Sequence, residues 1–181
     1  MSNRRVLVVG TTADYIDIIN RRFPQRAVFI TDVNERAKAA EPPPGSEDEL
    51  LCNLSQPEQV LAALRRHLRQ WQMELSGVAC FDCESMSTAA FIAHSFGLSY
   101  PSTEAVAKCR DKYVCRQIWR QAELPCPDVE LVHNASDAIS FLHKINGPAV
   151  LKPLTGSGSE LILLCSTEDE CVAAFNTLQS R

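Results

Sequence analysis

A lysine that leads into a loop of glycine, serine and threonine is the pattern in this chain most suited to chemistry. Residues 149–159 read AVLKPLTGSGS, and a second apolar run, residues 161–165, follows at once. Small residues let backbone N–H groups surround a phosphate, and Lys152 at the loop entrance would neutralise its charge. A Walker loop runs from strand to helix and carries its lysine at the end, whereas here the lysine comes first and a strand follows. The pattern predicts either a hairpin flap over a nucleotide or an ordinary Gly/Ser hairpin.

A second lysine stands at the start of a predicted helix, residues 111–122. Lys112 follows Arg110 and Asp111 there. A lysine near a helix N-terminus opposes the helix dipole, which suits a side chain that binds an anion. Arg116 lies one turn further on and would share its face. The alternative is a solvated helix start.

The sequence gives less support to a metal site, a redox site or a catalytic nucleophile. Of eight cysteines, only Cys80 and Cys83 form a C-x-x-C pair, and no second pair or nearby histidine completes a zinc site. Because Cys80 falls inside a predicted strand rather than at a helix start, we interpret the cysteines as reduced, structural thiols. The spacing supports no nucleophile with a partner base, so no catalytic residue and no metal ligand is assigned.

The residues that follow the first predicted strands could face a ligand. The segment after the first strand has a single glycine, Gly10, where a dinucleotide fingerprint needs three, and we interpret Asp32 as a strand-end turn residue. Asp82 and Glu84 could orient a substrate or a metal, but acids also favour helix N-termini, and we interpret both as caps.

Composition limits the partners. The 181 residues carry a net charge of −4, with 45% hydrophobic and 22% charged residues, as in a globular protein that does not grip nucleic acid. The basic cluster of Arg65, Arg66 and Arg69 is interpreted as a solvated helix face. No apolar run approaches the roughly 20 residues of a membrane helix, and the N-terminus lacks a signal-peptide pattern. These features predict a cytoplasmic protein that binds neither membrane nor nucleic acid.

Strands and helices alternate in the first half of the chain, which predicts an α/β class with a Rossmann-like, doubly wound parallel sheet of four or five strands. A capping box from Ser55 to Glu58 and a left-handed cap at Gly97 are expected to bound two of the helices. The predicted strands are residues 5–9, 27–31, 50–54 and 78–81.

The pattern changes after Pro101 to a separate, smaller α+β unit. A strand is predicted at residues 129–132, and a capping box of Thr167 with Glu170 opens the last helix. The other expected elements are helices over residues 102–109, 111–122, 136–145 and 167–178 and the hairpin around Lys152.

Taken in order, residues 77–98, 101–112, 124–127 and 150–159 resemble the ATP-grasp superfamily, which includes biotin carboxylase, carbamoyl phosphate synthetase, D-alanine–D-alanine ligase and L-amino-acid ligases. The resemblance implies a pre-ATP-grasp domain over residues 1–103. It implies the N-terminal part of an ATP-grasp domain over residues 104–181, with a lid subdomain from about residue 127.

The resemblance also implies the site. Lys112 and Lys152 would contact ATP, and a mobile lid loop would cover its phosphates; the loop comprises Thr155, Gly156, Ser157, Gly158 and Ser159. Members use ATP and Mg²⁺ to phosphorylate a carboxylate, and an amine or thiol acceptor then displaces phosphate from the acyl-phosphate. The implied partners are therefore ATP, a small carboxylate and that acceptor. Members often dimerise through the first domain, so a homodimer is one expected state.

Two departures qualify this expectation. Family loops usually carry a further glycine where this chain has Leu161, and Glu160 adds a negative charge beside the phosphates. The family's magnesium ligands and catalytic arginine are expected beyond Arg181, so the chain is expected to be the N-terminal fragment of a longer ligase and inactive alone. The alternative is a non-catalytic nucleotide-binding or scaffold module with a degenerate ATP-grasp loop.

Overall fold

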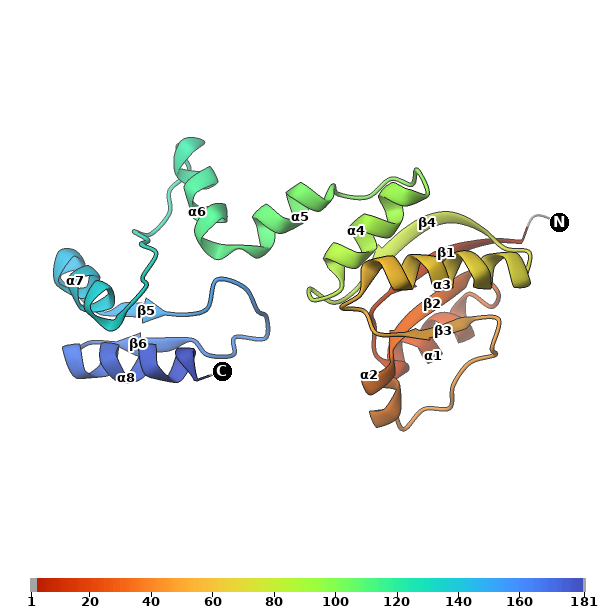
Figure 1. Ribbon diagram of the computed structural model, residues 1–181, viewed down its shortest axis with the longest axis horizontal. Helices are drawn as coiled ribbons and strands as arrows, with labels where there is room; N and C mark the ends of the chain where they lie inside the picture. Colours follow the sequence, from red (N-terminus) through yellow and green to blue (C-terminus); the bar gives the residue numbers. More distant parts are fainter. Residues whose placement is uncertain (1–2, 181) are drawn as a thin grey trace. The chain divides into compact units, whose positions relative to one another are not determined.

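The computed structural model describes residues 3–180 of the chain (Figure 1). Its internal contacts divide the chain into two compact units, Met1–Val106 and Ala107–Arg181. Each unit has a hydrophobic core of its own. None of the helices within residues 3–180 has both the length and the apolar character that crossing a bilayer requires.

The first unit is a parallel sheet covered by helices on both faces. Four strands lie in the order β3-β2-β1-β4, and every neighbouring pair is parallel. The elements are β1 (Arg4–Val9), α1 (Ala13–Arg22), β2 (Ala27–Asp32), α2 (Val33–Lys38), β3 (Glu49–Cys52), α3 (Pro57–Gln70), β4 (Glu74–Cys80) and α4 (Met86–Ser95). The predicted Rossmann-like sheet is confirmed.

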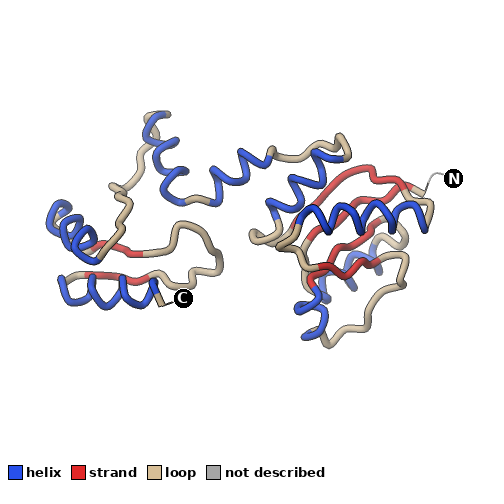
Figure 2. Tube along the Cα trace, in the orientation of Figure 1, coloured by secondary structure: helices blue, strands red, loops and turns tan. Residues whose placement is uncertain are grey.

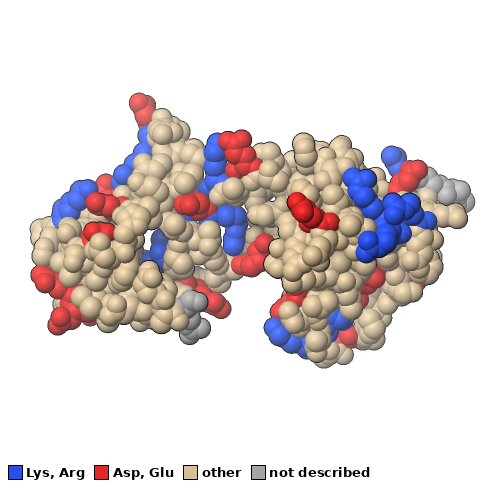
Figure 3. Space-filling model, viewed as in Figure 1, with Lys and Arg blue, Asp and Glu red and all other residues tan. Residues whose placement is uncertain are grey.

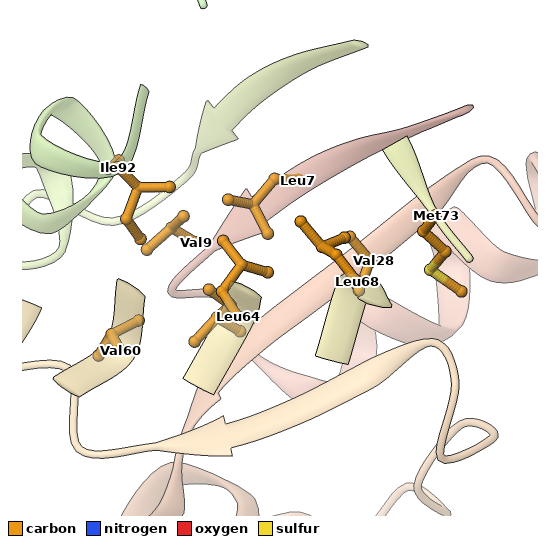
Figure 4. Packing of buried hydrophobic residues seen from close by; sticks show 10 residues of the cluster. Leu7, Val9, Val28, Val60, Leu64, Leu68, Met73 and Ile92 are labelled. Carbon is orange, nitrogen blue, oxygen red and sulfur yellow. The ribbon is translucent and has the colours of Figure 1, made fainter. Parts of the chain in front are cut away.

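Side chains that alternate between the two faces of each strand explain why helices cover both faces of the sheet. Leu7 and Val9 of β1 point to the face that α3 and α4 cover, where Leu64 and Ile92 are fully buried (Figure 4). Val8 points to the opposite face, where it packs in a separate cluster with residues of α1 and β2. Strands that are apolar on both faces fit a sheet covered on both sides. Because all neighbouring strands are parallel, their carboxyl ends lie at one edge of the sheet.

Two helix boundaries differ from the prediction. The capping box at Ser55 does not form: α3 begins after Gln56, and the Ser55 hydroxyl donates to the Asn53 side chain instead, at 2.7 Å. A short helix, α2, was not predicted; the Asp32 carboxylate caps it by accepting from the Asn34 N–H at 2.8 Å. Asp32 therefore acts at a strand end, as expected, but it also starts a helix.

Two other predictions for this unit are confirmed. Gly97 closes the turn after α4 with a left-handed backbone, φ 65°. The cluster of Arg65, Arg66 and Arg69 is exposed on α3, and Figure 3 shows blue side chains gathered over this helix.

The second unit packs two helices on one face of a hairpin. Its elements are α6 (Lys112–Gln121), α7 (Ala135–Ile145), β5 (Ala149–Leu151), β6 (Leu163–Cys165) and α8 (Glu168–Gln179), and α5 (Thr103–Arg110) crosses the boundary between the units. Leu142 of α7 and Ala174 of α8 pack against Ala149 and Cys165 of the strands. Figure 2 shows the long loop that joins β5 to β6.

The predicted strand at residues 129–132 is wrong. No strand is assigned between residues 122 and 134, and the hairpin sheet has only β5 and β6. Alternating apolar residues suit a strand, but a strand also needs a hydrogen-bonding partner, and no neighbour in the described part of this unit pairs with the segment. The capping box at Thr167 and Glu170 is present and starts α8.

Candidate functional site

The hairpin of the second unit presents one apolar face outward. β5 and β6 are antiparallel, and Val150 stands opposite Leu164. The exposed fractions of these two side chains are 51% and 65%, whereas their neighbours Ala149 and Cys165 are buried under α7 and α8. Lys152 comes two residues after Val150, which is the period of one strand face. The hairpin therefore combines an uncovered apolar surface with a lysine at its end.

Lys112 contacts the loop that joins the two strands of this hairpin. It is the first residue of α6, whose N-cap Asp111 accepts hydrogen bonds from the next backbone N–H groups. The Lys112 backbone N–H donates to the Leu154 carbonyl at 3.0 Å. Its ammonium donates to the carbonyls of Leu154 and Gly156, at 3.4 and 3.3 Å. Lys112 therefore lies against the loop that begins after Lys152.

Positive charge is concentrated around Lys112. Partial burial lowers the pKa of Lys112, the nearby cations Lys152 and Arg110 lower it further, and the Asp111 carboxylate acts in the opposite direction. Burial and the neighbouring cations both disfavour the positive charge of Lys112. A bound anion would offset both effects, because its negative charge stabilises the ammonium. The site is therefore electrostatically suited to a phosphate.

The loop holds several residues in the left-handed region. Gly156 and Gly158 have φ values of 109° and 65°, which glycine adopts without strain. Ser159 and Leu161 have φ values of 59° and 56°, although neither is a glycine. Leu161 occupies the position where the resemblance expects a glycine, so the departure in sequence coincides with a strained backbone. The Glu160 N–H donates to the Ser157 carbonyl at 3.3 Å and closes the turn.

This strain supports a prediction. Ser159→Gly is expected to raise the free energy of unfolding by about 0.5–1 kcal/mol, because glycine adopts a left-handed φ without the cost that serine has. Ser157→Gly is the matched control; its φ is not left-handed, so the added freedom of the unfolded chain is expected to lower stability by a similar amount. Urea unfolding followed by circular dichroism measures both. Equal signs for the two variants would contradict the loop conformation.

Other sequence candidates lie differently. The Arg116 guanidinium sits over the Trp119 ring, 4.3 Å from its centre. All eight cysteines are free. Burial raises the pKa of Cys80 to about 11, which keeps it a thiol at neutral pH. Within residues 3–180, no group of three or more histidine, cysteine or acidic side chains is arranged to hold a metal ion.

Two features of the site were missed in the sequence. The outward apolar face of Val150 and Leu164 could have been inferred from the alternation of the two strands. Arg110 was noted only as a flanking residue, yet its charge acts on Lys112. No local signal reports the contact of Lys112 with the Leu154 and Gly156 carbonyls, because those residues are distant in the chain.

Comparison with known protein families adds an independent result. Residues 109–181 match the RimK-like ATP-grasp domain. Biotin carboxylase 1 of Bacillus subtilis is 30% identical over 81 residues, which are 44% of this chain and 18% of that protein. The family match covers both lysines and the whole loop.

Solved structures show the same fold. The L-amino acid ligase from Bacillus licheniformis superposes with a TM-score of 0.72 and 18% identity, over 97% of this chain and 42% of that one. An N5-carboxyaminoimidazole synthase from Aspergillus clavatus, solved with ADP and 5-aminoimidazole ribonucleotide, superposes with a TM-score of 0.70 and 17% identity, over 100% of this chain and 46% of that one. At these identities the likeness establishes an ATP-grasp fold, and this chain spans less than half of either structure.

Proposed function

We propose that this chain, which has an ATP-grasp fold and matches the RimK-like ATP-grasp domain over residues 109–181, supplies the N-terminal part of the nucleotide site of an ATP-dependent ligase. Its relatives are ATP-grasp ligases, a family of enzymes. The observation that carries the proposal is the contact of Lys112 with the loop that Lys152 opens.

The two surfaces of the site suit the two ends of a nucleotide. The apolar face of Val150 and Leu164 offers a place for a base, whose aromatic ring gains from leaving water. Lys112, Lys152 and Arg110 provide charge for the phosphates. The proposed lid loop consists of Thr155, Gly156, Ser157, Gly158 and Ser159. Closure of such a loop would exclude water from a phosphoryl group in transfer.

The chemistry of the complete enzyme is part of the proposal. Phosphorylation of a small carboxylate by ATP gives an acyl-phosphate, and an amine or thiol then displaces the phosphate. Lys112 and Lys152 would stabilise negative charge on the phosphates during the first step. Within the described residues no group of side chains is arranged to hold a metal ion, so no residue of this chain is proposed as a ligand of Mg²⁺.

Isothermal titration of the 181-residue chain with Mg²⁺-ATP tests the nucleotide site, and an ADP-release assay tests turnover. We expect weak, saturable binding of ATP and no ADP release in the presence of candidate carboxylates and amines. Absence of any binding would contradict the nucleotide site. ADP release in step with an acceptor would contradict the proposal that this chain supplies only part of the enzyme.

A substrate screen then separates the two functions considered for the full protein. ADP release that depends on a carboxylate and an amine or thiol supports the ligase. Binding of ATP without release under any pair of substrates supports the non-catalytic nucleotide-binding module, and Glu160 in the loop is the residue that favours this second reading.

A further inference from the structure

The first unit exposes three adjoining apolar side chains on one face. They are Tyr15 and Ile18 of α1 and Phe81, which follows β4, with exposed fractions of 50%, 47% and 58%. Tyr15 and Phe81 stack with ring centres 6.0 Å apart, and Ile18 lies one helical turn beyond Tyr15. We call these three residues the α1 surface. Exposed apolar side chains that are scattered singly need no explanation, but a contiguous group indicates an interaction site.

The part of the sheet beside α1 is uncovered too. Ile16 of α1 packs against Val8 of β1, whereas β4, the strand at the sheet edge, contributes only Ala79 to this cluster of described residues. Val6 lies on the same face as Val8 and pairs with Gly77 of β4. Val6 is 38% exposed, and a Cβ atom at Gly77 would meet nothing within 4 Å. The α1 surface therefore adjoins an edge strand, which is itself a place where another chain can add.

The charges of α1 are ordered along the helix. Asp14 and Asp17 lie in its first half, and Arg21 and Arg22 lie in its last turn. Asp17 pairs with Arg21 within the helix, at 2.7 Å. Among residues 3–180, however, Arg22 pairs with no carboxylate and Asp14 pairs with no cation. One acid and one base at opposite ends of the same helix are thus left without an ionic partner.

A second, antiparallel copy of α1 would pair these charges. Asp14 and Arg22 each lie one turn from Ile18, in opposite directions along the helix. A two-fold axis at Ile18 therefore places Asp14 of each copy opposite Arg22 of the other. The same axis packs Ile18 against its own counterpart and brings Arg22 of the second copy to the exposed ring of Tyr15. A parallel copy would instead place like charges together.

We propose that the α1 surface is a homodimer interface, in which two copies of this chain pack α1 against α1 in antiparallel directions about a two-fold axis near Ile18. The surface is complementary to itself in charge and apolar at its centre, which is what a closed, isologous contact requires. The interface uses residues of the first unit alone, so it does not depend on the nucleotide site proposed above.

Sedimentation velocity of the 181-residue chain without nucleotide tests the interface. We expect a monomer–dimer equilibrium between about 1 and about 500 µM, the range in which a homodimer of modest affinity is populated. Ile18→Asp is expected to raise the dissociation constant at least 10-fold, because it places two carboxylates against each other at the axis. The new carboxylate lies one turn before Arg21 and Arg22, so the helix itself is expected to be retained.

Ile162→Asp is the matched control. Ile162 lies in the second unit and is also 47% exposed, so the change adds the same charge at a side chain of the same type and exposure. Dimerisation is expected to be unchanged in this variant. A chain that stays monomeric over the whole concentration range, or equal weakening by Ile18→Asp and Ile162→Asp, would overturn the proposal.

A charge exchange tests the antiparallel direction. Arg22→Asp is expected to weaken the dimer by about 3- to 30-fold, because it places a carboxylate opposite Asp14 of the second copy. The double variant Asp14→Arg with Arg22→Asp is expected to restore dimerisation, since the two ends again carry opposite charges. Its melting temperature is expected to fall, because both charges then oppose the helix dipole, so the recovery cannot come from a more stable fold. A double variant as weak as Arg22→Asp would show that the two helices do not pair in this way.

Discussion

Lys112→Met is expected to weaken the binding of Mg²⁺-ATP by about 10- to 100-fold, the range for loss of a hydrogen bond between charged groups. The reason is the position of the Lys112 ammonium, which reaches the carbonyls of Leu154 and Gly156 in the loop proposed to cover the phosphates. Isothermal titration calorimetry at low and at physiological salt measures the loss.

Lys144→Met is the matched control. Lys144 lies on α7 of the same unit, where its ammonium pairs with Glu130 at 3.1 Å. The change removes the same charge from the same unit, so a similar loss of ATP affinity in this control would show that only net charge matters. Equal affinity of Lys112→Met and the unmodified chain would contradict the assigned role of Lys112.

Lys112→Met is expected to weaken ATP binding but not to lower the stability of the ligand-free protein. Because burial and the neighbouring cations lower the pKa of Lys112, the unfolded chain binds this proton more tightly than the folded protein does. Charged Lys112 therefore destabilises the folded state at neutral pH, and stability rises with pH between the folded pKa and the ordinary value near 10.5. We expect the melting temperature of ligand-free Lys112→Met to be unchanged or higher than that of the unmodified chain at pH 7. We also expect its stability to rise less with pH than that of the unmodified chain. Thermal unfolding at several pH values measures both.

Gly10→Ala is expected to lower the free energy of unfolding by about 2–5 kcal/mol, the sum of left-handed strain and overpacking. Gly10 has a φ of 64°, and a Cβ atom there would overlap the Asp82 carboxylate and the Ser85 side chain. Ser85 is buried, and its backbone N–H donates to Asp82 at 2.5 Å, so the turn after β4 cannot move aside easily. Urea unfolding at pH 7 measures the change.

Gly97→Ala provides the comparison. Gly97 has a φ of 65°, nearly that of Gly10, but a Cβ atom there would meet nothing within 4 Å. Its expected cost is the backbone strain alone, about 1–2 kcal/mol. A loss in Gly10→Ala no larger than in Gly97→Ala would show that the turns after β1 and β4 are not packed together. Amide shifts of residues 81–85 would report the displaced turn directly.

Local patterns in the sequence account for most of the elements. Runs such as Val6 to Val9, apolar at every position, predict strands covered on both faces, and the sheet has that form. Thr167 with Glu170 predicts the start of α8, because both hydrogen bonds of a capping box lie within four residues. Two predictions from local patterns are wrong. The Ser55 side chain bonds to Asn53 instead of capping α3, and residues 129–132 have no neighbouring strand to pair with among the described residues.

By itself, the sequence determined the alternation of strands and helices, the hairpin with Lys152 at its end and the resemblance to ATP-grasp proteins. These depend on side-chain periodicity and turn chemistry, which act between residues close in the chain. Only the tertiary structure decided that Lys112 contacts the loop between β5 and β6 and that Gly10 packs against Asp82. It alone showed that segments following all four strands of the first unit line one cavity. Such contacts join residues distant in sequence, and their geometry follows from how whole elements pack rather than from the preference of any one residue.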